Sequence, residues 1–144
     1  AQLSPEVVLD IVMGAAAPHL NEVQCQAADH HLVANVSVNV RNMAERMYLA
    51  DLCISAAGST SWELCCLGVP TIQICLAENQ KQTVISLASA GATCSVGIDF
   101  IDSDLANLLK RVKSRETMLS LMEKASGIVD GLGVQRVRRI LNEC

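Results

Sequence analysis

The sequence predicts an α/β fold in which helices flank a parallel sheet, and two observations support that prediction. Short apolar runs alternate with helix-like segments about every 20 residues along the 144-residue chain, which indicates right-handed βαβ units. Half of the residues are apolar (51%), yet only 2% are aromatic. A core of that composition must be aliphatic, as in a parallel sheet covered by helices. The length fits one domain.

Five short apolar runs are expected to form the strands of this sheet. The first is rich in β-branched residues and is closed by Gly14. The third runs directly into a loop of small residues. The expected strands cover residues 7–13, 52–56, 71–76 and 94–96, and the second strand in chain order is expected within residues 31–40.

Helices are expected to fill the segments between these strands. The first helix is expected to begin at Pro18, because proline suits the first turn of a helix. Gly68 is expected to cap the helix before it, and 102–104 (Asp-Ser-Asp) to cap the helix through Lys113. The remaining expected helices cover residues 43–50, 62–67 and 80–90, and then 115–143 with a break near 131–133.

Composition excludes several function classes. The net charge of −4 argues against a nucleic-acid partner, and the arginines at 136, 138 and 139 are expected to form a solvated helix face. No apolar run approaches the roughly 20 residues that a membrane span needs. The amino-terminal segment lacks the features of a signal peptide. Seven cysteines without a Cys-x-x-Cys pair are expected to be reduced thiols of a cytoplasmic protein, with no metal and no cofactor.

The loop after the third expected strand is the best candidate binding site, because parallel sheets bind ligands beyond the carboxyl ends of their strands. Small residues from Ala56 to Ser59 allow a ligand to approach the backbone closely. The following helix presents free N–H groups and the positive end of its dipole, which suit a phosphate or diphosphate. Glu63, in the first helical turn, could accept the hydroxyls of a ribose. The Gly-Lys-Ser/Thr ending of a Walker loop is absent.

Spacing alone leaves a second interpretation of this loop open. Ser59 or Thr60 could be an ordinary helix cap, with Glu63 as its capping-box partner. Asn79 and Gln80, after the fourth expected strand, pose the same choice between sugar-binding amides and caps of the next helix. No Ser/His/Asp or Cys/His arrangement can be assembled, so no catalytic residue is predicted in this chain.

An ordered series of segments at 42–47, 50–55, 58–70 and 79–80 resembles the C-terminal domain of the UDP-sugar hydrolase family of pseudaminic acid biosynthesis. Its most specific parts are Gly-Ser-Thr-x-Trp-Glu, which begins at Gly58, and the Leu-Gly-Val-Pro that follows. Asp-Gly-Leu-Gly at 130–133, followed by Arg-Val, is also similar to the tail of that family. More distantly, the chain resembles the peptidoglycan UDP-N-acetylglucosamine transferase, which shares the two-domain GT-B fold.

The resemblance implies a UDP site. Val40 would offer its backbone to the edge of the uracil ring. Gly58, Ser59 and Thr60 would cradle the diphosphate, and Glu63 would hold the ribose hydroxyls. The implied partner of the chain is therefore UDP or a UDP-sugar.

The same resemblance implies that Asn79 and Gln80 face the sugar or the β-phosphate. One departure is Ala57, where the family usually has a second glycine. A methyl group there is expected to narrow the approach of the phosphate or to remove a positive-φ conformation.

Residues 1–144 are therefore expected to be one nucleotide-sugar-binding domain, the Rossmann-like C-terminal half of a GT-B fold. The resemblance covers the whole chain but only half of such an enzyme. It implies that the N-terminal catalytic domain and the first strand, loop and helix of this domain are missing, so that this chain alone is inactive. The implied reaction is hydrolysis of a UDP-linked 2,4-diacetamido-2,4,6-trideoxy sugar, which releases UDP and free sugar for nonulosonic acid synthesis. A sugar transferase on the same fold and a non-catalytic binding module are the alternatives.

Overall fold

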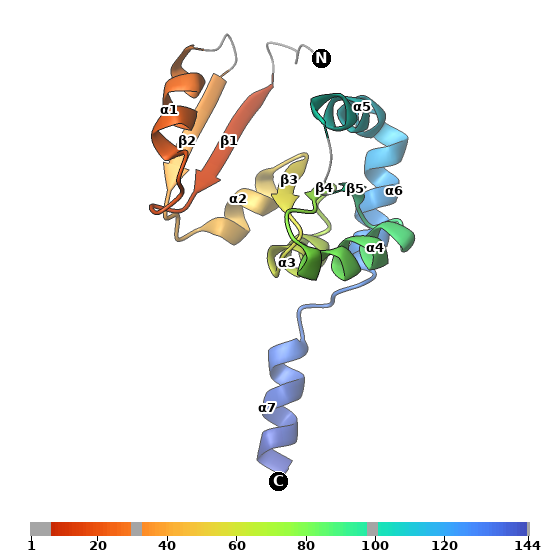
Figure 1. Cartoon of the computed structure of the whole chain (residues 1–144). Helices are drawn as coiled ribbons and strands as arrows, with labels where there is room; N and C mark the ends of the chain where they lie inside the picture. Colours follow the sequence, from red (N-terminus) through yellow and green to blue (C-terminus); the bar gives the residue numbers. More distant parts are fainter. Residues whose placement is uncertain (1–6, 30–32, 98–100, 144) are drawn as a thin grey trace. The chain divides into compact units, whose positions relative to one another are not determined.

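The computed structural model describes residues 7–29, 33–97 and 101–143, and the chain divides into two compact units between Met43 and Ala44. Each unit has its own parallel sheet (Figure 1). The predicted α/β class is confirmed, since every strand pair is parallel and helices connect the strands.

The first unit is a single β-α-β element. β1 (Val8–Met13) pairs in parallel with β2 (Val33–Val38), and α1 (Leu20–Asp29) connects them and packs against β2. β2 ends before Asn39, which has a positive φ of 52°. The Asn39 side-chain oxygen accepts a hydrogen bond of 3.1 Å from the Ala15 N–H. The strand expected within 31–40 is therefore found, and residues 31 and 32 of that segment lie outside the described ranges.

The second unit contains the remaining three strands in the order β3-β4-β5, all parallel. Ile72 of the central strand lies opposite Ile54 on one side and Cys94 on the other. The strands are β3 (Cys53–Ala56), β4 (Thr71–Ile74) and β5 (Cys94–Val96). The helices are α2 (Met43–Leu49), α3 (Thr60–Leu67), the short 3₁₀ turn η1 (Glu78–Gln80), α4 (Lys81–Ser89), α5 (Asp102–Val112), α6 (Arg115–Ser126) and α7 (Gly133–Glu143).

Aliphatic side chains cover both faces of this three-stranded sheet. On one face, Ile72 and Val96 pack against residues of α5 and α6, among them Val112. On the other face, side chains that contact α4 include Cys75, which packs with Val84. Because successive side chains of a strand point to opposite faces, Ile72 and Ile74 of β4 serve the first core, whereas Thr71 and Gln73 of the same strand are buried polar residues on the opposite face.

The ends of the helices can be compared with the caps that the sequence predicts. Gly68 adopts the left-handed conformation (φ 66°) and donates its N–H to Cys65, so the predicted C-cap of α3 is confirmed. The Asp104 carboxylate accepts from the Ile101 N–H at 3.1 Å, which closes the start of α5. The last helical region is divided into α6 and α7, as predicted. None of the helices within the described ranges is long and apolar enough to cross a membrane.

Candidate functional site

The loop between β3 and α3 begins at a buried residue. Ala57 is 1% exposed and packs with Cys75 and Val84 in the core. Its methyl group therefore points away from the open side of the loop, and its φ is not positive. The expectation that alanine at this position removes a positive-φ conformation is wrong, because the backbone here is not left-handed. The expectation that the methyl group narrows the phosphate approach stays a prediction.

Gly58 stands at the open part of the loop. A Cβ atom added to Gly58 would meet no other atom within 4 Å. The turn is closed by hydrogen bonds of 3.1 Å from the Ser61 N–H to the Gly58 carbonyl and from the Trp62 N–H to the Ser59 carbonyl. The first N–H groups of a helix have no partner inside the helix, so the backbone at Ser59 and Thr60 can donate to a ligand.

The hydroxyl groups of the loop differ in their environment. Ser59 is the N-cap residue of α3, but its side chain makes no capping hydrogen bond, and Trp62 occupies the position of the capping-box partner. The capping-box interpretation of Ser59 and Glu63 is therefore wrong. Ser61 is buried, and its Oγ has no hydrogen-bond partner among the described residues.

Glu63 lies in the first turn of α3 and lines an open pocket of about 350 Å³. Trp62, which is 42% exposed, lines it beside Glu63. The remaining walls are almost entirely apolar and come from α2, from the outer side of α3 and from the link between α6 and α7: Ala44, Met47, Cys66, Leu67, Val129 and Gly131. The pocket therefore offers a single carboxylate at the edge of an apolar surface.

Asn79 and Gln80 lie in η1, beyond the end of β4. The Gln80 side-chain oxygen accepts a hydrogen bond of 2.9 Å from the Leu76 N–H, so it closes the loop after the strand. It makes no capping bond to α4. Asn79 is exposed. The predicted roles of both amides in sugar or phosphate binding stay predictions.

Val40 belongs to the first unit, whereas the other predicted UDP-binding residues belong to the second. Within the second unit, the chain brings Gly58, Ser59, Thr60 and Glu63 together at one loop and helix start. The contact of Val40 with uracil stays a prediction.

Of the cysteines that lie close to this site in sequence, two have thiols whose pKa is raised. Burial raises the pKa of the Cys53 thiol on β3 and of the Cys65 thiol on the inner side of α3, so both are neutral at pH 7. Across the described ranges, no group of three or more His, Cys, Asp or Glu side chains could hold a metal ion. The chemical features that the site offers are therefore backbone N–H groups, hydroxyl groups and one carboxylate.

Sequence reasoning missed the pocket walls. Ala44 and Met47 were identified only as helix residues, and Trp62 only as part of a motif. The spacing of Ala44 and Met47 places them on one side of α2, but nothing in the sequence shows that this side meets the outer side of α3. Trp62, Glu63, Cys66 and Leu67 do recur at a spacing of one helical turn, which is the signal that could have identified this surface.

A family model and a curated relative both match most of the chain. A family model described as the glycosyltransferase family 28 C-terminal domain matches residues 4–137. The spore coat polysaccharide biosynthesis protein SpsG of Bacillus subtilis (strain 168) is 31% identical over 135 residues. The matched region is 92% of this chain and 40% of that protein.

Solved structures show the same fold. MurG of Acinetobacter baumannii superimposes with a TM-score of 0.80 at 24% identity, over 96% of this chain and 42% of that one. WaaG, a glycosyltransferase involved in lipopolysaccharide biosynthesis, has a TM-score of 0.69 at 18% identity, over 88% of this chain and 35% of that one. The chain thus has the α/β fold of a GT-B half, and it spans about two fifths of the length of its relatives.

Proposed function

The chain belongs to the family of glycosyltransferase family 28 C-terminal domains, and from this premise we propose that it is the UDP-sugar-binding half of a two-domain enzyme. The family match runs through both compact units, which supports one binding domain over residues 1–144. The relatives are more than twice as long, which supports a further domain in the whole protein.

One observation carries this proposal: the open start of α3 lies directly beside a carboxylate that lines a pocket. Gly58 leaves space in front of the loop, and the α3 N-terminus favours an anion there. Glu63 follows one turn later, at the pocket edge. A diphosphate at the loop would thus direct its attached ribose toward Glu63, which can accept two hydroxyl hydrogen bonds.

For the whole protein, the proposed reaction is hydrolysis of a UDP-linked 2,4-diacetamido-2,4,6-trideoxy sugar. Water attacks the sugar, the bond to the diphosphate breaks, and UDP and free sugar are released. The sequence series around Trp62, Glu63, Asn79 and Gln80 supports this choice. A general acid or base must lie within hydrogen-bond reach of the reacting atoms, and we assign that group to the part of the enzyme outside this chain. The proposed location is the cytoplasm.

Sugar transfer is the second candidate, and the family match favours it. The matching family is described as a glycosyltransferase family. In that case an acceptor hydroxyl replaces water as the nucleophile. The binding half is the same in both cases.

We expect UDP to stabilise the chain through Glu63. A ligand at 100 times its dissociation constant adds about 2.7 kcal/mol to the free energy of unfolding, which is visible as a rise in melting temperature. Glu63→Ala should lose most of this rise without a lower melting temperature of its own, because Glu63 is exposed. The measurement is a thermal-shift titration with UDP, UMP and CMP.

Glu116→Ala is the matched control, because Glu116 is also an exposed glutamate in the first turn of a helix, α6. It should respond to UDP like the unchanged chain. A chain that is silent to millimolar UDP, or a Glu63→Ala variant that responds normally, would favour a non-catalytic module whose loop is only a helix start.

Hydrolysis and transfer are separated by the requirement for an acceptor. The full-length enzyme that contains this chain is incubated with the UDP-sugar, and UDP release is followed by chromatography. Release of UDP and free sugar in buffer alone, at a rate that added acceptor does not raise, is the expected result. Release that begins only when an acceptor is present would identify a transferase.

A further inference from the structure

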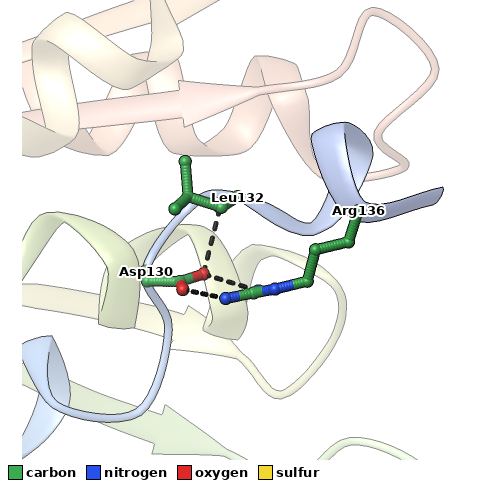
Figure 2. Close-up of polar contacts among 3 residues, drawn as sticks. All are labelled: Asp130, Leu132 and Arg136. Carbon is green, nitrogen blue, oxygen red and sulfur yellow. Dashed lines mark hydrogen bonds and ion pairs between the residues drawn. The ribbon is translucent and has the colours of Figure 1, made fainter. Parts of the chain in front are cut away.

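The link between α6 and α7 is organised around one carboxylate. Asp130 Oδ1 accepts hydrogen bonds from the Leu132 N–H at 3.0 Å and from Arg136 Nη1 at 2.9 Å. Asp130 Oδ2 pairs with Arg136 Nη2. Figure 2 shows the guanidinium facing the carboxylate edge to edge, with the Leu132 backbone on the same carboxylate. A two-bond Arg–carboxylate pair restricts geometry more than a single contact does.

Gly131 lies inside this arrangement and also forms part of the pocket. It has a φ of 72°, a left-handed conformation that suits glycine. A Cβ atom added to Gly131 would lie 3.1 Å from Cys66 Sγ, so the backbone approaches the outer side of α3 closely. Val129, on the other side of Asp130, lines the same pocket. The carboxylate thus stands between two residues that form one pocket wall.

We propose that Asp130 and Arg136 are a positioning pair, which holds Val129 and Gly131 against α3 and so maintains the pocket that Trp62 and Glu63 line. This inference rests on the proposed function, because it treats the pocket beside Glu63 as part of the nucleotide site. Neither residue of the pair lines the pocket itself. Their effect on a ligand is transmitted through the backbone at 129–132.

The electrostatics of the pair agree with this role. The hydrogen bond from Arg136 and then the Leu132 N–H lower the pKa of Asp130 from 3.8 to about 2, so the carboxylate is fully charged at neutral pH. Both side chains are more than half exposed. Such pairs contribute little to global stability, which makes a local positioning role separable from folding.

The test is a double-mutant cycle with two readouts. Asp130→Asn, Arg136→Gln and the double variant are compared for UDP affinity and for acrylamide quenching of Trp62, the only tryptophan of the chain. Each single variant should bind UDP about two- to fivefold more weakly, as an exposed pair allows. The double variant should be no weaker than either single one, and Trp62 quenching should change in all three. Arg136→Lys, which keeps the charge, should restore part of both readouts.

Glu143→Gln is the matched control, because it opens the other ion pair of α7, Arg139 Nε to Glu143 Oε1 at 2.8 Å, which does not contact the pocket. It should leave both readouts unchanged. Equal losses in Glu143→Gln and Asp130→Asn would overturn the inference in favour of a general charge effect of α7. Normal UDP binding in both single variants would overturn it as well. If the chain without substitutions does not bind UDP, the proposed function is wrong. The positioning pair is tested separately by Trp62 quenching, and it is rejected if quenching is the same in all the variants as in the chain without substitutions.

Discussion

Two glycines of the second unit have opposite physical roles, although both flank α3. Gly68 occupies a left-handed conformation that ends the helix, whereas Gly58 has an ordinary φ and open space in front of it. Glycine is needed at Gly68 because the backbone there is left-handed, and at Gly58 only because a ligand would use the open space. A substitution at Gly68 should therefore lower stability, whereas one at Gly58 should weaken ligand binding.

Gly68→Ala is expected to cost about 1 kcal/mol of unfolding free energy, since a left-handed conformation is strained by roughly that amount for residues with a Cβ. Its Cβ would contact Ser126 at an ordinary 3.5 Å, so no clash adds to the cost. Gly58→Ala should leave stability within about 0.5 kcal/mol but weaken UDP binding by blocking close approach. Urea unfolding and UDP titration of both variants check this. A Gly58→Ala variant that binds UDP normally would show that the phosphate lies elsewhere.

At the scale of elements, the start of α7 depends on a salt bridge rather than on burial. No residue of α7 is buried within the described part of the chain, and the Leu132 carbonyl accepts the first helical hydrogen bond, from the Arg136 N–H at 3.1 Å. Asp130 contacts both of these residues. The junction should therefore respond to acid and salt more than the helices that cover the sheet.

This junction is expected to weaken between about pH 4 and about pH 2. The folded chain lowers the pKa of Asp130 from 3.8 to about 2 and so binds this proton less readily than the unfolded chain. The contribution of the pair is complete above the unfolded value and is lost as pH falls through the folded one. The difference in unfolding free energy between the unchanged chain and Asp130→Asn should therefore shrink over that interval. Urea curves at pH 7, 4, 3 and 2.5 measure it, and a constant difference would show that folding does not lower the pKa of Asp130.

Strands and helix ends could be predicted from the sequence where a single local pattern or residue determines them. Apolar runs located all five strands, and Gly68 located the end of α3. The predicted ends of strands and helices were less accurate where the conformation of a single residue interrupts the apolar or helical pattern. Asn39, with its positive φ, ends β2 before the apolar Val40, so the strand fills only part of the segment 31–40. η1 takes up Gln80, which was expected to begin α4.

At the scale of the whole molecule, the sequence could not show contacts between distant segments. The pocket beside Glu63 joins α2, α3 and the α6–α7 link, which are separated by up to 87 positions from Ala44 to Gly131. No periodicity relates such segments. The division of the strands between two sheets was hidden for the same reason, because the apolar pattern of a strand does not identify its neighbour. The motif at Gly58 was recognisable because its residues are adjacent.

The absence of aromatic side chains from the described core has a practical optical consequence. Trp62 is 42% exposed at the pocket and Tyr48 is 71% exposed on α2. The cores on both faces of the sheet are aliphatic, so they absorb no near-ultraviolet light. Tryptophan fluorescence from this chain therefore reports on the surroundings of Trp62 at the pocket, whereas backbone circular dichroism and heat absorption follow the unfolding of the whole chain. Ligand capture and unfolding can thus be followed on one sample through two different signals.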